Sequence, residues 1–175
     1  MMEYDFKLKF ALPSDGPPPE ELTERLGEAG CDDALVGIGQ PGRIALDFSR
    51  EAASARSAVI SALSDVKRAI PDARLIEVAP DFVGLTDVAD LVGVSRQNLR
   101  KLWLAHATDF PIPIHEGSST LWHLAAVLRW LVDCAGYQVD RRLIEVAEAA
   151  LQVNLLKESD HRMSVMPKKL RTLVA

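Results

Sequence analysis

The stretch LTDVADLVGVSRQNLRKLW, residues 85–103, ends in a dense run of hydrogen-bond donors. The donor side chains are those of Arg96, Gln97, Asn98, Arg100 and Lys101. No carboxylate occurs between Ser95 and Ala107. Arginine can bond to guanine O6 and N7, glutamine or asparagine can bond to adenine N6 and N7, and the cations can also neutralise phosphate. These residue types predict contact with a nucleic acid, provided that one helix presents them together.

Residues for other kinds of chemistry are sparse or badly spaced. Cys31 and Cys134 lie far apart without a zinc-finger partner, and no HExxH motif occurs, so we expect two free, packed thiols and no metal site. The chain also lacks GxSxG, a phosphate-binding GxxxxGK[ST] loop and an obvious pair of carboxylates. Catalysis is therefore not expected, and no cofactor is predicted.

The segment GIGQPG, residues 37–42, formally matches the dinucleotide-binding pattern GxGxxG. That pattern has a mechanism only where the glycines open a helix whose N-terminus receives a pyrophosphate. Here the alternating segment RIALDF follows, which is typical of a strand, and Pro41 suits a turn. We therefore interpret GIGQPG as the turn of a hairpin.

The donor-rich run needs two short, steeply crossing helices to expose it. Thr86 is expected to cap a helix over residues 87–92, and Ser95 is expected to cap a second helix over residues 96–105. Gly93 permits the turn between them, since glycine adopts a positive φ at little cost. Small or apolar residues at the crossing would form a shared core: Val88, Ala89, Val92, Val94, Leu99 and Leu102.

With the segments FPIPI and LWHLAAVLRWL that follow, residues 85–135 resemble the winged helix-turn-helix of MerR and AlpA/excisionase DNA-binding proteins. The resemblance implies that the second helix enters the major groove, that a hairpin wing touches the DNA backbone, and that a third helix over residues 121–135 braces both. Two features differ from the family. The chain does not continue into a long coiled coil, and a large N-terminal region precedes the motif.

The remaining candidate contacts lie at the ends of these elements. Ser95 could present its hydroxyl and the backbone amides to a phosphate. Two short extended pieces around residues 116–118 would form the wing, with His115 and Ser118 as phosphate contacts. The predicted DNA-binding set is Thr86, Ser95, Arg96, Gln97, Asn98, Arg100, Lys101, His115 and Ser118. Trp103, Trp122 and Trp130 are interpreted as core residues that brace the wing.

The N-terminal region shows a different periodicity. Alternation predicts strands over residues 4–12, 34–38, 43–48 and 74–78, with helices over 17–30 and 50–70. The order β-α-β-β-α-β resembles a ferredoxin-like sandwich. The predicted fold class is therefore α+β, with a sandwich domain over residues 1–80 and a winged helix-turn-helix domain over 81–138. Residues 139–175 would form a C-terminal helix, capped by Asp140 and ending near Lys157, and a basic tail.

The net charge of −5 is concentrated away from the donor-rich run. Residues 1–80 carry nine basic and fourteen acidic groups, whereas residues 139–175 carry seven basic and five acidic groups. Screening over about 8 Å at physiological salt lets an acidic protein hold DNA on a locally basic face. No long apolar run or signal-peptide core is present, so a cytoplasmic protein without a membrane partner is expected.

Two functions from different classes fit these features. The first is a sequence-specific transcriptional regulator or antitoxin-like repressor that binds double-stranded DNA as a homodimer. The apolar face of the final helix, from Leu143 to Leu155, or the sandwich sheet would then supply the dimer interface. The second is a protein-interaction module that binds a partner such as a toxin, with the two-helix motif as a scaffold.

Overall fold

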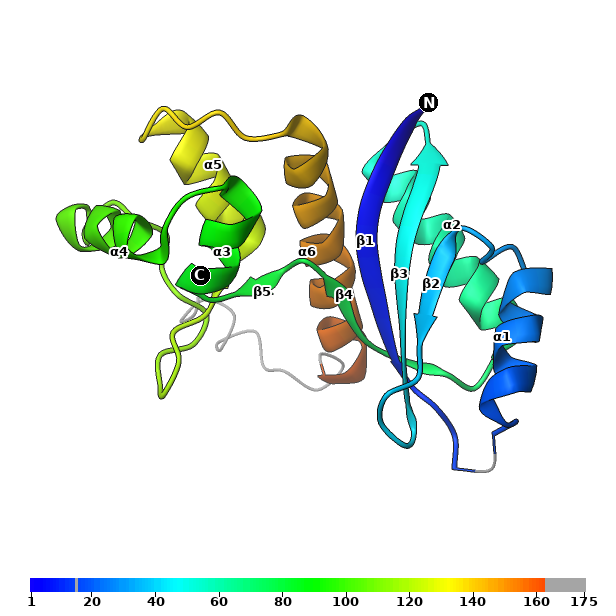
Figure 1. The fold of residues 1–175 in the computed structure, drawn as a ribbon. Coiled ribbons are helices and arrows are strands. Elements are labelled where there is room, and N and C mark those ends of the chain that lie inside the picture. Colours follow the sequence, from blue (N-terminus) through cyan, green and yellow to red (C-terminus); the bar gives the residue numbers. More distant parts are fainter. Residues whose placement is uncertain (15, 163–175) are drawn as a thin grey trace.

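The computed structural model describes residues 1–14 and 16–162, which form a mixed α+β fold with a four-stranded antiparallel sheet and six helices (Figure 1). Two hydrophobic cores are present, one against the sheet and one among the later helices. A long helix, α6 (Arg141–Arg162), lies between them and contributes side chains to both. The basic tail beyond residue 162 lies outside the described residues.

The sheet contains β1 (Met2–Ala11), β2 (Ala34–Gly37), β3 (Arg43–Ala52) and β4 (Arg74–Ala79). The strands are hydrogen-bonded in the order β2-β3-β1-β4, and each neighbouring pair is antiparallel. Alternate residues of β1 point to opposite faces. Tyr4, Phe6, Leu8 and Phe10 are therefore all buried on one face.

Helices α1, α2 and α6 pack on this apolar face. Helix α1 (Pro19–Glu28) begins at a proline, and at the start of α2 (Ala55–Ala69) the Ser54 hydroxyl accepts a hydrogen bond from the Ser57 amide at 3.2 Å. Both positions are favourable helix starts. The opposite face of the sheet is polar and carries the ion pairs Lys7–Asp47 (3.1 Å) and Lys9–Glu77 (3.0 Å).

The boundary between β3 and α2 differs from the prediction that a helix begins at Arg50. Strand β3 continues to Ala52, because it pairs with β1 along the whole length of both strands, from Ala11↔Arg43 to Met2↔Ala52. Arg50 is therefore a strand residue, and its side chain is buried. Apolar periodicity alone did not separate the end of the strand from the start of the helix.

The second half of the chain is built from short elements. They are β5 (Phe82–Val83), α3 (Leu85–Val92), α4 (Arg96–Ala105), β6 (Trp122–His123) and α5 (Leu124–Asp133). Strand β5 was not predicted, and it pairs with β6 in a two-stranded sheet. The third helix was expected from residue 121, but residues 121–123 are extended because they take part in this pairing and in a bridge to His115.

Helix α6 packs on both halves of the molecule. Val146, Ala149 and Ala150 belong to the core against the sheet, whereas Ala147 belongs to the core of the second half. The apolar face that was considered for dimerisation is thus largely used within the chain, although Leu155 and Leu156 remain exposed. None of the helices in the described residues has both the length and the apolar character needed to cross a membrane.

Candidate nucleic-acid interface

Helices α3 and α4 are joined by a tight three-residue turn. Gly93 has a φ of +72°, in the left-handed region, and the Val94 amide donates to the Ala89 carbonyl at 2.9 Å. Ser95 is the N-cap of α4, since its hydroxyl accepts a hydrogen bond from the Asn98 amide at 3.2 Å. The expectations for Gly93 and for the Ser95 cap are both confirmed.

The small residues between the two helices form the expected contact. Val88 and Leu99 are fully buried, and Ala89 is 1% exposed. Val92, Val94 and Leu102 pack partly buried against the same core. A larger side chain at residue 89 would have to displace its neighbours, because protein cores are packed at crystal-like density.

The N-terminus of α3 corrects one prediction. The N-cap position is occupied by Gly84, and the Asp87 carboxylate accepts a hydrogen bond from the Gly84 amide at 2.8 Å. Thr86 therefore lies inside the first turn, with an exposed side chain, and does not cap the helix. An acidic residue in the first turn also suits the partial positive charge of a helix N-terminus, which explains why Asp87 takes this role.

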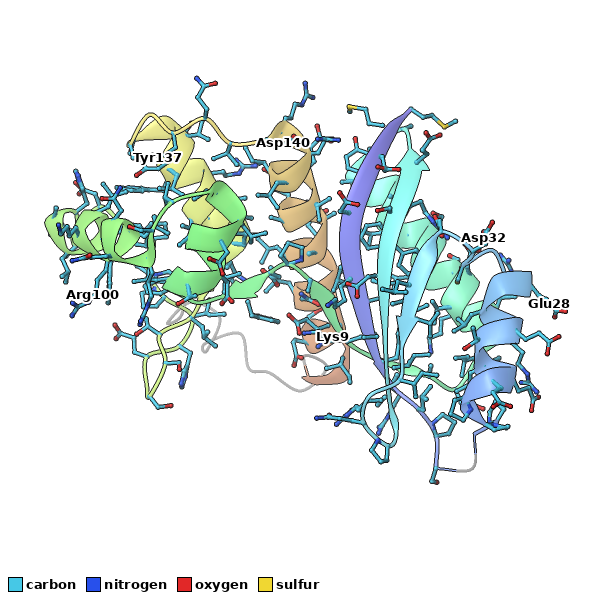
Figure 2. All side chains as sticks on the ribbon, viewed as in Figure 1. Lys9, Glu28, Asp32, Arg100, Tyr137 and Asp140 are labelled. Atoms are coloured by element: carbon cyan, nitrogen blue, oxygen red, sulfur yellow. The ribbon has the colours of Figure 1, made fainter. Side chains whose placement is uncertain are left out.

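The outward face of α4 collects the predicted donors. Arg96, Gln97, Asn98, Arg100 and Lys101 are all exposed. Figure 2 shows that Arg100 extends from α4 at the end of the molecule farthest from the large sheet. The structure thus brings these five side chains together on one short helix, from which Leu99 alone is fully buried.

The cations of α4 differ from most others in the molecule. In the part of the chain that the structure describes, Arg96, Arg100 and Lys101 form no ion pair, whereas cations elsewhere commonly have a carboxylate partner. The partnered group contains Lys7, Lys9, Arg25, Arg50, Arg68, Arg129, Arg141, Arg142 and Lys157. The free cations of α4 can therefore approach a phosphate or a base edge without breaking an existing pair.

The wing segment is a narrow loop rather than a regular hairpin. It is closed by a single bridge, in which the Leu121 amide donates to the His115 carbonyl at 3.0 Å. His115 and Ser118 are exposed near its tip. A Cβ atom on Gly117 would lie 2.6 Å from His115 Nε2, so the imidazole folds over the turn and would have to move if residue 117 carried a side chain.

The tryptophans support this segment from inside, as predicted. Trp122 is 1% exposed, and its indole nitrogen donates to the Pro111 carbonyl at 3.0 Å. Its ring contacts Trp103 edge-on at 5.3 Å between centroids, a favourable aromatic geometry. Trp130 is buried against Phe110 at 4.9 Å. The loop is therefore fixed at its base while its tip extends into solvent.

A buried polar cluster joins the two halves and was missed by sequence reasoning. The carboxyl group of Asp81 is fully buried, 2.8 Å from Nδ1 of His123 and 2.8 Å from the amide nitrogen of Asn154. Asn154 also exchanges two hydrogen bonds with the backbone of Val78. Asp81 lies between β4 and β5, His123 lies in β6 and Asn154 lies in α6. Buried Asn and Asp in apolar surroundings would have been the only sequence signal.

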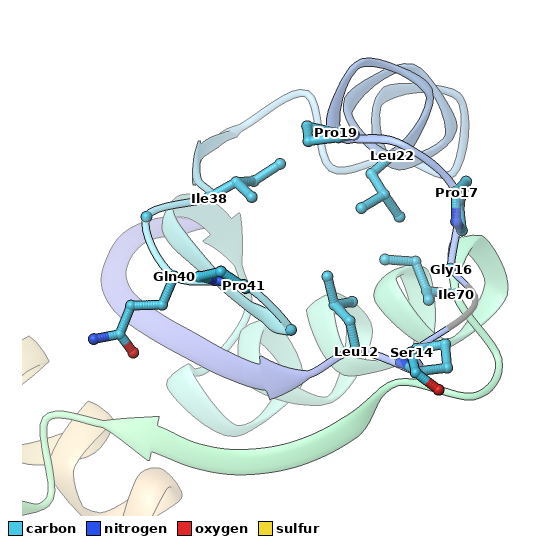
Figure 3. Close-up of a pocket in the computed structure, with 13 residues that line it drawn as sticks. Leu12, Ser14, Gly16, Pro17, Pro19, Leu22, Ile38, Gln40, Pro41 and Ile70 are labelled. Atoms are coloured by element: carbon cyan, nitrogen blue, oxygen red, sulfur yellow. The ribbon is translucent and has the colours of Figure 1, made fainter.

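The glycine-rich segment forms the β2–β3 turn, as interpreted from the sequence, with Gly42 at a φ of +73°. It borders a cavity of about 440 Å³ whose walls include Leu12, Leu22, Ile38 and Ile70. Figure 3 shows the side chain of Gln40 pointing away from this cavity. No charged residue is found among the described residues that line it, so no described side chain there supplies a positive charge for a pyrophosphate.

The described residues contain no group of three or more His, Cys, Asp and Glu side chains that could hold a metal ion. Comparisons with protein families, with curated proteins and with solved structures found no match to this chain.

Proposed function

We propose that this protein is a sequence-specific DNA-binding regulator of transcription, whose helix α4 enters the major groove of double-stranded DNA. The observation that carries the proposal is the exposed, carboxylate-free face of α4 with its unpaired Arg96, Arg100 and Lys101. In this proposal α3 and α4 form a helix-turn-helix, residues 111–121 form the wing, and α5 braces both, as in MerR and AlpA-like proteins.

The contacts divide by chemistry. Arg96, Gln97 and Arg100 lie on the N-terminal half of α4, the part of a recognition helix that usually meets base edges. Lys101, Ser95, Thr86 and the wing residues His115 and Ser118 are proposed to contact phosphates, which position the helix but carry no sequence information. Asn98 has a side chain that is free to bond to adenine, because only its backbone amide is used by the cap.

The N-terminal half would act as an oligomerisation or sensing domain. Its element order and its sheet order β2-β3-β1-β4, with α1 and α2 on one face, support a ferredoxin-like classification. We propose that the protein functions as a homodimer, since a single small domain reads only one half-site and symmetric operators require two. We propose domain boundaries near residues 80 and 138.

The test is a binding titration of the full chain on a duplex selected from a random library, with a scrambled duplex alongside. Arg96→Ala and Arg100→Ala should each reduce the free energy of binding to the selected duplex by about 1–3 kcal/mol. Each should also relax the preference for one base at one position of the site. Lys101→Ala should weaken binding to both duplexes equally. It should also reduce the slope of log K against log salt concentration by about one unit. Arg56→Ala, which removes an exposed arginine from α2, is the matched control and should change neither.

A protein-interaction module is the second candidate. It is favoured by the exposed apolar side chains of Ile112 (89%) and Leu104 (57%), beside the proposed DNA face. Full affinity and discrimination in folded Arg96→Ala and Arg100→Ala proteins would contradict the recognition role of α4. Affinity for DNA no stronger than that of a basic peptide would favour the protein-binding function instead.

A further inference from the structure

A second basic cluster lies in the N-terminal half, at the end of the sheet. It lines a hollow of about 450 Å³ between β1, β3 and β4, with α2 and α6 contributing from the side. The lining residues are Ala11, Arg43, Lys67, Arg74, Leu75, Ile76, Lys157 and Glu158. Four of these residues are cations, although residues 1–80 as a whole carry an excess of acid.

The strand register explains how two of the cations meet. Ala11 at the end of β1 pairs with Arg43 of β3 on one side and with Arg74 of β4 on the other. Neighbouring antiparallel strands are separated by about 5 Å, so the two arginine backbones lie roughly 10 Å apart across a small alanine. Both arginine side chains are exposed and form no ion pair within the described residues. Two guanidinium groups can therefore converge on one anion between them.

The two lysines are held in place by backbone carbonyls. The Lys67 ammonium donates to the carbonyls of Pro71 (3.1 Å) and Ala73 (2.5 Å), just before β4. The Lys157 ammonium donates to the carbonyl of Ile76 within β4 and lies 3.0 Å from the Glu158 carboxylate. An ammonium has three donors, so each lysine keeps one for a further partner. Both charges are thus fixed along β4 before any ligand arrives.

The charge in the hollow is only partly compensated. Among the described residues that line the hollow, four are cations and one, Glu158, carries a carboxylate, which is paired with Lys157. Like charges gathered in a concave site repel one another, and a multiply charged anion removes that repulsion. The volume is within the range of small-molecule sites, and Ala11, Leu75 and Ile76 add apolar wall.

We propose that this hollow binds a phosphorylated small molecule, with its phosphate between Arg43 and Arg74 and near the two lysines. An adjoining hollow of about 380 Å³ shares Arg43 and Ile76 with it and is lined by small residues such as Gly37 and Ala45. The uncharged part of the ligand extends into this space. The site is lined by the sheet, α2 and the end of α6, without a residue of α4, and does not depend on the proposed DNA contact.

The test is calorimetric titration of the full chain with pyrophosphate at 150 mM salt. Saturable binding is expected, weakened at least tenfold by Arg74→Glu and by Arg43→Gln. Arg56→Glu is the matched control, because it alters the charge of an exposed arginine elsewhere on the same half and should leave binding unchanged. Thermal melting verifies that every variant is folded. Absence of saturable binding, or equal weakening by Arg56→Glu, overturns the site.

Duplex DNA is the competing occupant, and the same variants distinguish it. Arg74→Glu should leave the affinity for a selected duplex within twofold of the parent, whereas Arg100→Ala lowers it. If Arg43→Gln and Arg74→Glu instead reduce DNA affinity as much as Arg100→Ala does, the hollow belongs to a DNA surface and the small-ligand assignment is wrong. Loss of pyrophosphate binding with intact DNA binding supports the assignment and leaves the proposed function untouched.

Discussion

The four-stranded sheet and the α3–α4 helix pair use arginine in opposite ways. Arg50 in β3 is 7% exposed and donates to both Asp33 oxygens, to Asp65, to Ser61 and to the Gly30 carbonyl. Its guanidinium also lies 4.9 Å from the ring centre of Phe48. Arg100 in α4 is exposed and forms no ion pair in the described part of the chain. One arginine is fully used inside the fold, and the other is left for an outside partner.

The difference shows that a buried, paired arginine stabilises the fold, whereas an exposed, unpaired arginine is available for binding. The two carboxylates around Arg50 raise its pKa, the hydrogen bond with Asp33 being the largest cause. Such a buried charge is stable only while its partners remain, so it fixes the loop before β2, β3 and α2 in one arrangement. An exposed unpaired cation contributes little to the free energy of unfolding. It contributes to the free energy of binding when a phosphate or a base approaches.

The largest effect is expected at Arg50. Arg50→Met leaves the Asp33 and Asp65 carboxylates without their cation, which costs about 3–5 kcal/mol in the free energy of unfolding. Urea denaturation followed by circular dichroism measures it. Arg56→Met is the control for an exposed arginine and should change the free energy by less than about 0.5 kcal/mol. Equal stability of the two variants would remove the distinction between a buried and an exposed arginine.

The cluster that connects the two halves should come next. Asn154→Ala leaves the buried Asp81 carboxyl and the Val78 backbone short of partners, at a net cost of about 1–3 kcal/mol in the free energy of unfolding. Gln152→Ala, at an exposed position on the same helix, serves as the control. Hydrogen exchange of β4 and β5 should rise in Asn154→Ala alone. Unchanged exchange at both strands would show that α6 holds the halves together by apolar packing only.

A smaller effect is expected at the α3–α4 turn. Gly93→Val places a β-branched residue at φ +72°, which costs roughly 1–2 kcal/mol from backbone strain. Apart from the neighbouring residues in the chain, no described heavy atom lies within 4 Å of the added Cβ, so the Cβ itself meets no tertiary crowding. Gly93→Asn isolates the conformational term, because asparagine tolerates this region. We expect the valine variant to lose α3–α4 order and DNA affinity, and the asparagine variant to retain most of both. Equal loss in both variants would contradict a purely conformational role.

The smallest effect is expected at the two cysteines, which differ in exposure. Cys31 is buried near Arg50, whereas Cys134 at the end of α5 is exposed, which corrects the expectation that both are packed. Burial, reinforced by Asp65, raises the pKa of Cys31 to about 11. A raised pKa keeps this thiol neutral at pH 8, with roughly 0.1% as thiolate. Ellman's reagent should therefore modify one thiol in the native protein and two in urea, and Cys134→Ser should abolish the native reaction.

Much of the architecture follows from local patterns in the sequence. Alternation over residues 4–12 predicts β1, and the Ser95 hydroxyl and Gly93 predict the start of α4 and the turn before it. These signals are local, since a cap or a positive φ depends on the residue itself and its nearest neighbours. The absence of carboxylates along α4 is also visible in the sequence, and it is why five candidate contacts could be named.

Other features depend on residues that are distant in the chain. The sequence alone did not separate β3 from α2 at Arg50, because pairing with β1 extends β3 to Ala52. The Arg50 side chain is buried against Asp33 in the turn before β2 and Asp65 in α2. Strand β5 exists only because β6 lies beside it, and Asp87 rather than Thr86 completes the first turn of α3. A two-residue strand is too short for its periodicity to be detected. Composition also does not show which strand pairs with it or which side chain bonds to the first turn of a helix.

The same distinction separates the two candidate binding sites. The sequence by itself determined the α4 face, because one helix turn brings residues 96, 97, 100 and 101 together whatever the rest of the fold does. Only the tertiary structure decided the basic hollow, since Arg43, Lys67, Arg74 and Lys157 are brought together by strand register and by the packing of α6. Short-range geometry follows from helical repeat, whereas convergence of distant charges requires the complete fold.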